Sequence, residues 1–264
     1  MTPPQVPTAE QSLALVHHSL SRQGDRDYNE DAYCHVRDGD IVSFAVADGM
    51  GGAAGGMQAS GIAMATIRKN RLTLDPTEFA NQLEALSAEI KAEQVQKPNL
   101  SKMSTTVAEL RIDTYTQKAI WAHWGDTRVY WFRDGELKEM TEDHSVVQSL
   151  VAAGLISEDE AATYPKRNVL LGAAGTTSEV GPTVLERAVT LANDDAFLLC
   201  SDGVWSVVNT AFMEASLKRS ASVQDWINAI MDEVDRAGKG SNDNFTATGI
   251  WVSADNEKTL SPGL

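Results

Sequence analysis

The sequence predicts an α+β protein in which mainly antiparallel sheets pack together and amphipathic helices cover them on the outside. Two kinds of pattern support this prediction. Asp-Gly pairs separate short apolar segments, which is typical of β-hairpins, and other stretches repeat apolar residues at helical spacing. No internal repeat or low-complexity linker divides the 264 residues, so we expect a single domain.

Two segments have the form strand, two-residue turn, strand. The first consists of 32–36, Asp38-Gly39 and 41–47, and the second of 129–132, Asp134-Gly135 and 136–140. Asp-Gly favours such turns because both residues tolerate positive φ angles. Apolar runs predict further strands at 118–124, 196–200 and 245–252.

Residues 108–113 alternate between apolar and charged side chains. The apolar members are Ala108, Leu110 and Ile112, and the charged members are Glu109, Arg111 and Asp113. Because successive side chains of a strand point to opposite faces, this alternation predicts a strand with one face in water.

Helices are expected where apolar residues recur every three or four positions. One such stripe consists of Phe79, Leu83, Leu86 and Ile90, and another of Val223, Trp226, Ile227, Ile230 and Val234. A third helix is expected at about 57–68. Each stripe is narrow, so these helices should place one face on a sheet and the other in water.

Composition indicates a soluble protein of a reducing compartment, the cytoplasm. The formal net charge of −15 argues against binding to nucleic acid or an anionic membrane, because like charges repel. No apolar run is long enough to span a bilayer. Cys34 and Cys200 lie in apolar segments without paired spacing, which predicts buried thiols. We expect flexible tails at 1–11 and 254–264 around one domain at 12–253.

Acidic residues stand at the ends of several predicted strands. Asp48, Asp126 and Asp202 follow strands, Asp243 precedes the last strand, and Glu30 and Asp31 precede the first. Each of them alone is more often only a turn residue. If the strand ends meet at one rim, however, six carboxylates converge, which is unfavourable unless cations neutralise them. Oxygen ligands without a His or Cys cluster favour Mg²⁺ or Mn²⁺ over Zn²⁺.

Glycines and one arginine add to this pattern. Gly49 would let the backbone turn closely enough for its carbonyl oxygen to become a ligand. The glycine-rich run 48–52 lacks the Lys-Ser/Thr ending and the dinucleotide spacing of nucleotide-binding loops, which disfavours a nucleotide site. The planar guanidinium of Arg26 could donate two hydrogen bonds to a phosphate. His123 and His144 are expected to be structural, since neither belongs to a ligand-spaced pair.

Taken in order, these motifs resemble those of the PPM or PP2C-type protein phosphatases, especially the compact bacterial ones. The matching stretches cover about residues 22–252 and are Arg26-Asp27-Tyr28-Asn29-Glu30-Asp31, Ala47-Asp48-Gly49-Met50-Gly51-Gly52, Ser104-Thr105-Thr106, Gly125-Asp126-Thr127-Arg128-Val129-Tyr130, Asp143-His144-Ser145, Arg167-Asn168-Val169, Ser201-Asp202-Gly203 and Asp243-Asn244. The resemblance implies a four-layer αββα sandwich with a metal centre at one end of the sheet pair.

The resemblance also implies two core metal ions, Mn²⁺ or Mg²⁺. One would be held by Asp48, Asp202 and Asp243. The other would be held by Asp48, Glu30 and the carbonyl oxygen of Gly49, so that Asp48 bridges the pair. A water between the two ions would attack phosphorus directly. The absence of a Cys-x5-Arg loop and of a Gly-x-Ser-x-Gly elbow agrees with a reaction that needs no nucleophilic side chain.

Further roles follow from the same resemblance. Asp126 with Asp202 would provide a weaker third metal site, Asp31 would orient water from behind the ligands, and Arg26 would bind the substrate phosphate. Eukaryotic members carry a histidine after the Asp-Gly pair as a possible general acid. This chain has Met50 there, so the proton donor to the leaving oxygen is not assigned.

The segment 145–172 is expected to form a mobile flap subdomain beside the active site. It contains Gly154 and the helix-starting sequence 157–160. Many bacterial relatives continue the motif at 167–169 with a Thr-Arg pair. In this chain Leu171-Gly172 follow, which weakens the case for a substrate-binding arginine in this segment.

The implied function is that of a monomeric phosphatase that removes phosphate from phosphoserine and phosphothreonine in proteins and opposes a serine/threonine kinase. Two alternatives remain. A binding module on the same fold that has lost catalysis should lack one or more metal acids, and none is missing from this sequence. Another two-metal hydrolase, either a nuclease or a small-molecule phosphatase, is disfavoured by the order of the motifs, and the nuclease also by the negative charge.

Overall fold

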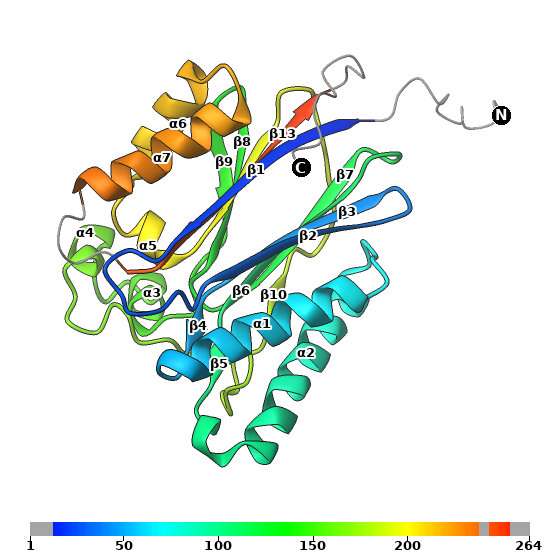
Figure 1. Ribbon diagram of the computed structural model, residues 1–264. Coiled ribbons are helices and arrows are strands. Elements are labelled where there is room, and N and C mark those ends of the chain that lie inside the picture. The colour runs from blue at the N-terminus through cyan, green and yellow to red at the C-terminus, as the bar shows by residue number, and fades with distance from the viewer. Residues whose placement is uncertain (1–12, 238–242, 254–264) are drawn as a thin grey trace.

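The computed structural model describes residues 13–237 and 243–253. Two sheets lie face to face between two outer layers of helices (Figure 1). All pairs of neighbouring strands in the described part are antiparallel. The predicted α+β class and the four-layer αββα arrangement are therefore confirmed.

Each sheet combines strands from distant parts of the chain. In spatial order, the first sheet consists of β1 (Ala14–Arg22), β13 (Phe245–Ser253), β12 (Ala196–Cys200), β8 (Arg128–Arg133) and β9 (Glu136–Met140). The second consists of β10 (Thr183–Val184), β7 (Lys118–Trp124), β6 (Val107–Asp113), β3 (Ile41–Ala47) and β2 (Ala32–Asp38), and β11 (Val189–Thr190) also pairs with β7. A short pair, β4 (Gly49–Met50) and β5 (Ser104–Thr105), lies beyond the end of β3.

Both expected hairpins are present, but one turn lies a residue later than predicted. Asp38 pairs with Ile41, so the first turn is Gly39-Asp40, and Gly39 has a φ angle of 60°. The second turn is Asp134-Gly135 as expected, with φ angles of 55° and 72°. Two successive positive φ angles are the requirement of a type I′ turn, which Asp-Gly meets at little cost.

The three expected helices are also present. They are α1 (Ala53–Lys69), α2 (Pro76–Gln96) and α7 (Val223–Ala237), and the apolar stripes of α2 and α7 are buried as predicted. The helix start expected at 157–160 is confirmed by α4 (Glu158–Ala162), where Ser157 and Glu160 form a capping box. The sequence patterns did not predict α6 (Thr210–Arg219), the short helices α3 (Val146–Ala152) and α5 (Asp202–Trp205), or the 3-10 turn at Pro98–Leu100. α1 and α2 cover the second sheet, and α6 and α7 cover the first (Figure 1).

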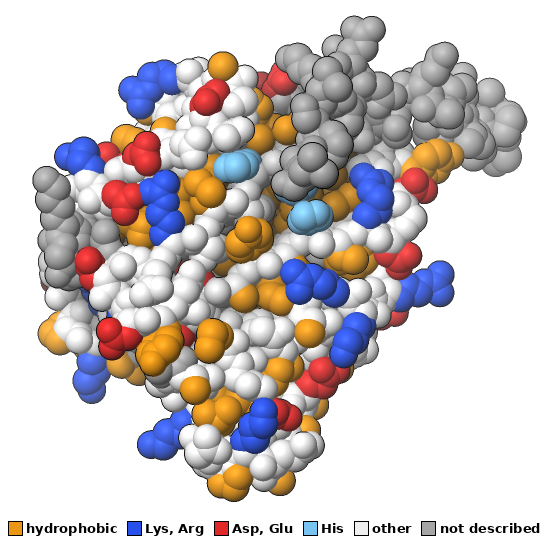
Figure 2. Space-filling model, viewed as in Figure 1, with side chains coloured by type: hydrophobic (Ala, Val, Ile, Leu, Met, Phe, Trp, Pro, Cys, Tyr) orange, Lys and Arg blue, Asp and Glu red, His pale blue; other side chains and the backbone are white. Residues whose placement is uncertain are grey.

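A separate apolar core lies between the two sheets. Phe44 and Leu110 of the second sheet pack there with Phe197 and Ile250 of the first, and all four side chains are buried. Because both faces of each sheet are covered, the strands are fixed in position and their ends form a defined rim. Acidic and basic side chains are interspersed over the face in Figure 2, so the excess negative charge does not gather on that face.

The prediction that 108–113 has one face in water is wrong. β6 lies between β7 and β3, and the face that carries Glu109 and Arg111 is covered by helices. Both charged side chains are fully buried and pair at 2.7 Å, the guanidinium lies 3.6 Å from the centre of the Phe79 ring, and Ser43 Oγ donates to Glu109 at 2.7 Å. Mutual pairing explains how two charges can occupy a covered face.

The remaining expectations have mixed outcomes. Cys34 and Cys200 are free, buried thiols as predicted, and burial raises the pKa of Cys34 to about 12. Within the described ranges, no helix is both long and apolar enough to span a bilayer. The expected tails, 1–11 and 254–264, lie outside the described residues. The segment 145–172 contains α3 and α4, and its mobility remains a prediction.

Candidate active site

The predicted acidic residues meet in one pocket at the rim of the two sheets. The pocket has a volume of about 250 Å³ and is lined by Arg26, Glu30, Asp48, Gly49, Met50, Asp126, Asn168, Leu170, Asp202, Asp243 and Asn244. Of the predicted site residues, only Asp31 is not part of this lining; it is buried and hydrogen-bonded to Ser201. Asp48, Asp126 and Asp202 each stand within two residues of the end of a strand, β3, β7 and β12 respectively, and these strand ends lie at the same rim.

The pKa values show how strongly these carboxylates interact. Desolvation raises the pKa of Asp48 well above its usual range, and the charges of Asp31, Asp202, Asp126 and Asp243 raise it further. Burial also raises the pKa of Asp31 to about 7 and that of Asp126 to about 8, with a further contribution from the charge of Asp202 in both cases. Ionisation of all the carboxylates in the cluster is therefore unfavourable, and bound cations would stabilise the ionised form.

Two of the predicted oxygen ligands meet beside Gly56, in the first turn of α1. A Cβ added at Gly56 would collide with Glu30 Oε1 and would lie 2.6 Å from the carbonyl oxygen of Gly49. A Cβ added at Gly49 would lie 2.7 Å from the backbone oxygen of Glu30. Glycine at 49 and 56 therefore lets the two backbone segments pack closely, and glycine at 56 leaves room for the Glu30 carboxylate beside the Gly49 carbonyl oxygen.

Arg26 lies at the mouth of the pocket. Its guanidinium donates to Asp243 Oδ2 at 2.5 Å, and this hydrogen bond raises the pKa of Arg26. The side chain is 61% exposed, so it can also reach toward a ligand at the pocket entrance.

Asn244 fastens the loop that carries Arg26 and Glu30. Its side-chain oxygen accepts the N–H of Glu30 at 2.8 Å, and its amide nitrogen donates to the backbone oxygens of Gln23 at 2.7 Å and Tyr28 at 2.8 Å. The sequence predicted Asn244 only as part of a motif. Its anchoring role depends on a contact between distant parts of the chain that no local pattern reports.

Hydroxyl groups of buried residues form hydrogen bonds that fix the acids in place. Ser201 Oγ donates to Asp31 Oδ2 at 2.7 Å and accepts the N–H of Thr246 at 3.0 Å. Thr106 Oγ1 accepts the N–H of Asp48 at 3.1 Å. These bonds connect the acids to β13 and to the start of β6, so the rim is fixed by the sheets themselves.

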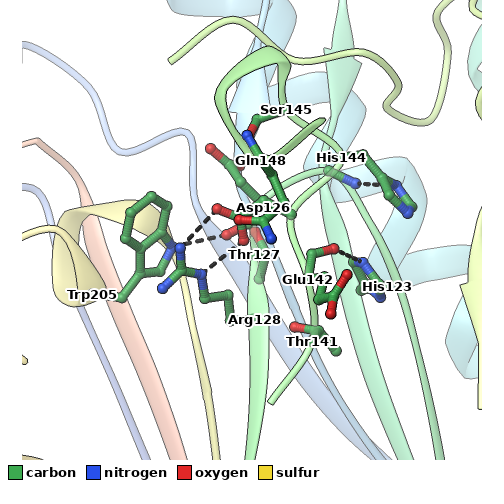
Figure 3. Close-up of polar contacts among 12 residues, drawn as sticks. His123, Asp126, Thr127, Arg128, Thr141, Glu142, His144, Ser145, Gln148 and Trp205 are labelled. Atoms are coloured by element: carbon green, nitrogen blue, oxygen red, sulfur yellow. Dashed lines mark hydrogen bonds and ion pairs between the residues drawn. The ribbon is translucent and has the colours of Figure 1, made fainter. Parts of the chain in front are cut away.

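Trp205 and Arg128, which lie together beside Asp126, fix the loop of Asp126 (Figure 3). Trp205 Nε1 donates to the backbone oxygen of Asp126 at 2.8 Å. Next along the chain, Arg128 forms two hydrogen bonds of 2.7 Å with Asp143, and its guanidinium lies 3.7 Å from the centre of the Trp205 ring. The sequence prediction did not include Trp205, although it stands one turn after Asp202.

His123 and His144 have the contacts of structural residues, as predicted. His123 Nε2 is 2.7 Å from the backbone oxygen of Glu142, and His144 Nδ1 accepts the N–H of Gly125 at 3.2 Å. Burial lowers the pKa of each ring to about 4. Both rings are therefore neutral near pH 7 and lie outside the acidic pocket.

The residues of the pocket fit hard divalent cations. Glu30 Oε1, Asp31 Oδ1 and Asp202 Oδ1 are buried without a hydrogen-bond partner, which is costly for carboxylates unless cations bind. Among the described residues, no group of three or more Asp, Glu, His or Cys side chains is already positioned to coordinate a metal ion. Arg26 donates a hydrogen bond to Asp243, so a cation would draw the Asp243 carboxylate from its present partner. Oxygen donors alone suit Mg²⁺ or Mn²⁺.

Comparisons with known proteins agree with this site. Residues 20–243 match the family model described as protein phosphatase 2C. A serine/threonine phosphatase, stp, of Listeria innocua is 31% identical over 209 residues, which cover 76% of this chain and 81% of the relative. The serine/threonine protein phosphatase PstP of Mycobacterium tuberculosis is 36% identical over 168 residues, which cover 61% of this chain and 31% of PstP.

Solved structures give the same result. The Mycobacterium tuberculosis phosphatase PstP/Ppp superposes with a TM-score of 0.79 at 28% identity, covering 90% of this chain and 99% of that one. The catalytic domain of PstP in complex with two manganese ions superposes with a TM-score of 0.78 at 28% identity, covering 92% and 100%. This chain therefore belongs to the protein phosphatase 2C family of metal-dependent serine/threonine phosphatases.

Proposed function

We propose that this chain removes phosphate from phosphoserine and phosphothreonine in proteins by direct attack of water at a pair of divalent cations. The observation that carries the proposal is a single pocket in which the predicted acids converge, with Arg26 at its mouth. The names of the relatives and the PstP structure with two manganese ions support it. We further propose that the protein works as a cytoplasmic monomer and opposes a serine/threonine kinase.

Five residues would hold the two core ions. Asp48, Asp202 and Asp243 would bind one, and Asp48, Glu30 and the carbonyl oxygen of Gly49 would bind the other. When bound, two Mg²⁺ or Mn²⁺ ions lower the pKa of a shared water and neutralise charge on the phosphate. The acids of the pocket are suited to this task because they offer oxygen donors, and Glu30 Oε1 and Asp202 Oδ1 are buried without a hydrogen-bond partner.

Other residues would act on the substrate and on water. Arg26 would exchange its bond with Asp243 for a fork of hydrogen bonds to the phosphate. Asp31, fixed by Ser201, would orient water through its free oxygen. Asp126 with Asp202 would form a weaker third cation site. Met50 lines the pocket but carries no transferable proton, so it does not replace the histidine of eukaryotic members.

The decisive experiment is phosphate release from a phosphothreonine peptide, with Mn²⁺ or with a chelator. We expect activity only with the metal, and at least a hundredfold loss in Asp202→Asn, since an anionic ligand of one core ion and of the weaker third site is removed. Asp40→Asn is the matched control, because it removes one exposed carboxylate at the other end of β3. Activity that survives both chelation and Asp202→Asn would refute the mechanism.

A further inference from the structure

A second and larger cavity lies next to the acidic pocket. It has a volume of about 490 Å³, and we call it the flap-side pocket. Its apolar lining includes Trp121 and Met140 of the sheets and Leu171 of the segment that follows α4. Leu170 lines the acidic pocket and the next residue, Leu171, lines the flap-side pocket, so the two cavities share a wall.

Acidic residues make the lining of the flap-side pocket negatively charged. Its lining includes Glu139, Glu142 and Asp143 and contains no lysine or arginine. Asp143 is already paired with Arg128, at 2.7 Å. Within the described part of the chain, the carboxylates of Glu139 and Glu142 have neither a hydrogen bond nor an ion pair. The negative charges of Glu139 and Glu142 in the pocket lining are therefore not neutralised by a neighbouring cation.

The two histidines of the lining do not offset this charge. His144 Nδ1 accepts the N–H of Gly125, so the ring proton sits on Nε2, which faces Thr183 Oγ1 at 2.9 Å. His123 is 3% exposed and its pKa is lowered to about 4 by burial. The lining is consequently anionic at neutral pH.

Glu139 is exposed, and it also lies beside the apolar side chains that line the flap-side pocket. It is the cross-strand partner of Trp131, and Trp131 packs against Trp121 with 6.0 Å between the ring centres. Because cross-strand partners lie on the same face of a sheet, Glu139 belongs to the face that looks toward the other sheet. Desolvation raises the pKa of Glu139, which shows that water does not fully compensate its charge. An unpaired carboxylate beside an apolar wall favours an amphipathic cation.

We propose that the flap-side pocket binds an arginine or lysine side chain of the phosphoprotein substrate. The proposal rests on the proposed function and adds a substrate class to it. The alkyl part of the side chain would contact Trp121, Met140 and Leu171, and its cationic end would pair with Glu139 and Glu142. The shared wall explains why the occupant belongs to the substrate: a chain with its phosphate in the acidic pocket can reach the flap-side pocket by crossing Leu170 and Leu171.

The test compares phosphothreonine peptides that differ only in carrying arginine or the uncharged isostere citrulline. The residue is placed at successive positions on either side of the phosphothreonine. At the matching position we expect the wild-type protein to prefer the arginine peptide in kcat/KM. The preference should fall about two- to fivefold in Glu139→Gln and again in Glu142→Gln, the size of a partly exposed ion pair. The change should appear in KM, because the contact is remote from the reacting atoms.

Asp40→Asn controls for the general attraction between a protein of net charge −15 and a basic peptide. It removes the same unit of charge at the β2–β3 turn and should leave the arginine preference unchanged. Equal losses in Asp40→Asn and Glu139→Gln would overturn the proposal, as would a wild-type protein that does not discriminate between the peptides at any position.

A binding measurement separates this proposal from the proposed function. Fluorescence anisotropy of the same labelled peptides, with a chelator present, reports binding without turnover. Tighter binding of the arginine peptide that is lost in Glu139→Gln supports the flap-side pocket even if no peptide is hydrolysed. Hydrolysis of both peptides with equal binding would refute the pocket and leave the phosphatase assignment intact.

Discussion

Trp205 Nε1 donates a hydrogen bond of 2.8 Å to the backbone carbonyl oxygen of Asp126 (Figure 3). Trp205 is the last residue of α5, and Asp202 is its first. The bond therefore connects the two acids of the proposed third cation site through one short helix. Arg128 stacks on the same indole at 3.7 Å, which holds the ring in place.

Trp205→Phe should weaken the weakest Mn²⁺ site. The substitution keeps a ring for Arg128 but removes the N–H, and a carbonyl oxygen that loses its partner costs about 1 to 3 kcal/mol. We expect a severalfold loss of affinity at that site by calorimetry of the metal-free protein. Trp226→Phe is the matched control, because its indole N–H donates to Met213 at 3.1 Å in the outer helix layer.

A double variant decides whether Trp205 acts through Asp126. In an Asp126→Asn background, Trp205→Phe should produce little further loss of Mn²⁺ affinity, since the ligand it positions is already altered. Independent, additive losses would show that the tryptophan only supports the fold.

The acids of this site could be predicted because each stands next to a strand end, a feature that is visible in a few consecutive residues. Asp48 after β3 and Asp202 after β12 are examples. Trp205 and Asn244 could not be assigned their roles, because their partners are distant in sequence and only the fold brings them together. Similarly, β1 has no Asp-Gly turn to mark it and is recognised only by its pairing with β13.

Gly56→Ala should abolish most activity, whereas Gly61→Ala should not. A Cβ at Gly56 would collide with Glu30 Oε1 and crowd the Gly49 carbonyl, whereas a Cβ at Gly61 meets nothing within 4 Å. Both positions lie in α1, where alanine otherwise stabilises a helix by about 0.5 to 1 kcal/mol. Phosphate release and Mn²⁺ affinity should therefore fall only in Gly56→Ala. Equal behaviour of the two variants would show that Gly56 has no special role.

His123 should make the protein sensitive to mild acid. Its pKa is about 4 in the folded chain, compared with 6.5 ordinarily, so the unfolded chain binds the proton first as pH falls. The stabilising contribution is present above pH 6.5, is lost progressively between 6.5 and 4, and amounts to about 3 kcal/mol at most.

His123→Gln isolates this contribution, because glutamine does not titrate but can still donate to the Glu142 oxygen. Urea unfolding of both proteins across this pH range should show their stability difference changing with pH, in favour of the variant at low pH. The carboxylates of the active site have raised pKa values, which make the protein relatively more stable at low pH. They contribute equally to both proteins, so their effect cancels when the two stabilities are subtracted. Parallel pH profiles would contradict the prediction.

The buried pair of Glu109 and Arg111 shows where alternation misleads, because charged residues at every second position also occur on a covered face when they neutralise each other. Arg111→Met should destabilise the protein by about 3 to 5 kcal/mol, since it leaves Glu109 buried and uncompensated.

Glu109→Gln combined with Arg111→Met should cost less than Arg111→Met alone. Arg111→Met already removes the unpartnered Arg111 Nη2, and the added Glu109→Gln replaces a buried, uncompensated carboxylate with a neutral amide, which costs less to bury. Arg236→Met is the surface control: it breaks the exposed pair with Glu233, and its cost should be far smaller than that of Arg111→Met. Urea midpoints measure all three. A single variant as stable as the surface control would mean that Glu109 takes up a proton or reaches water when its partner is removed.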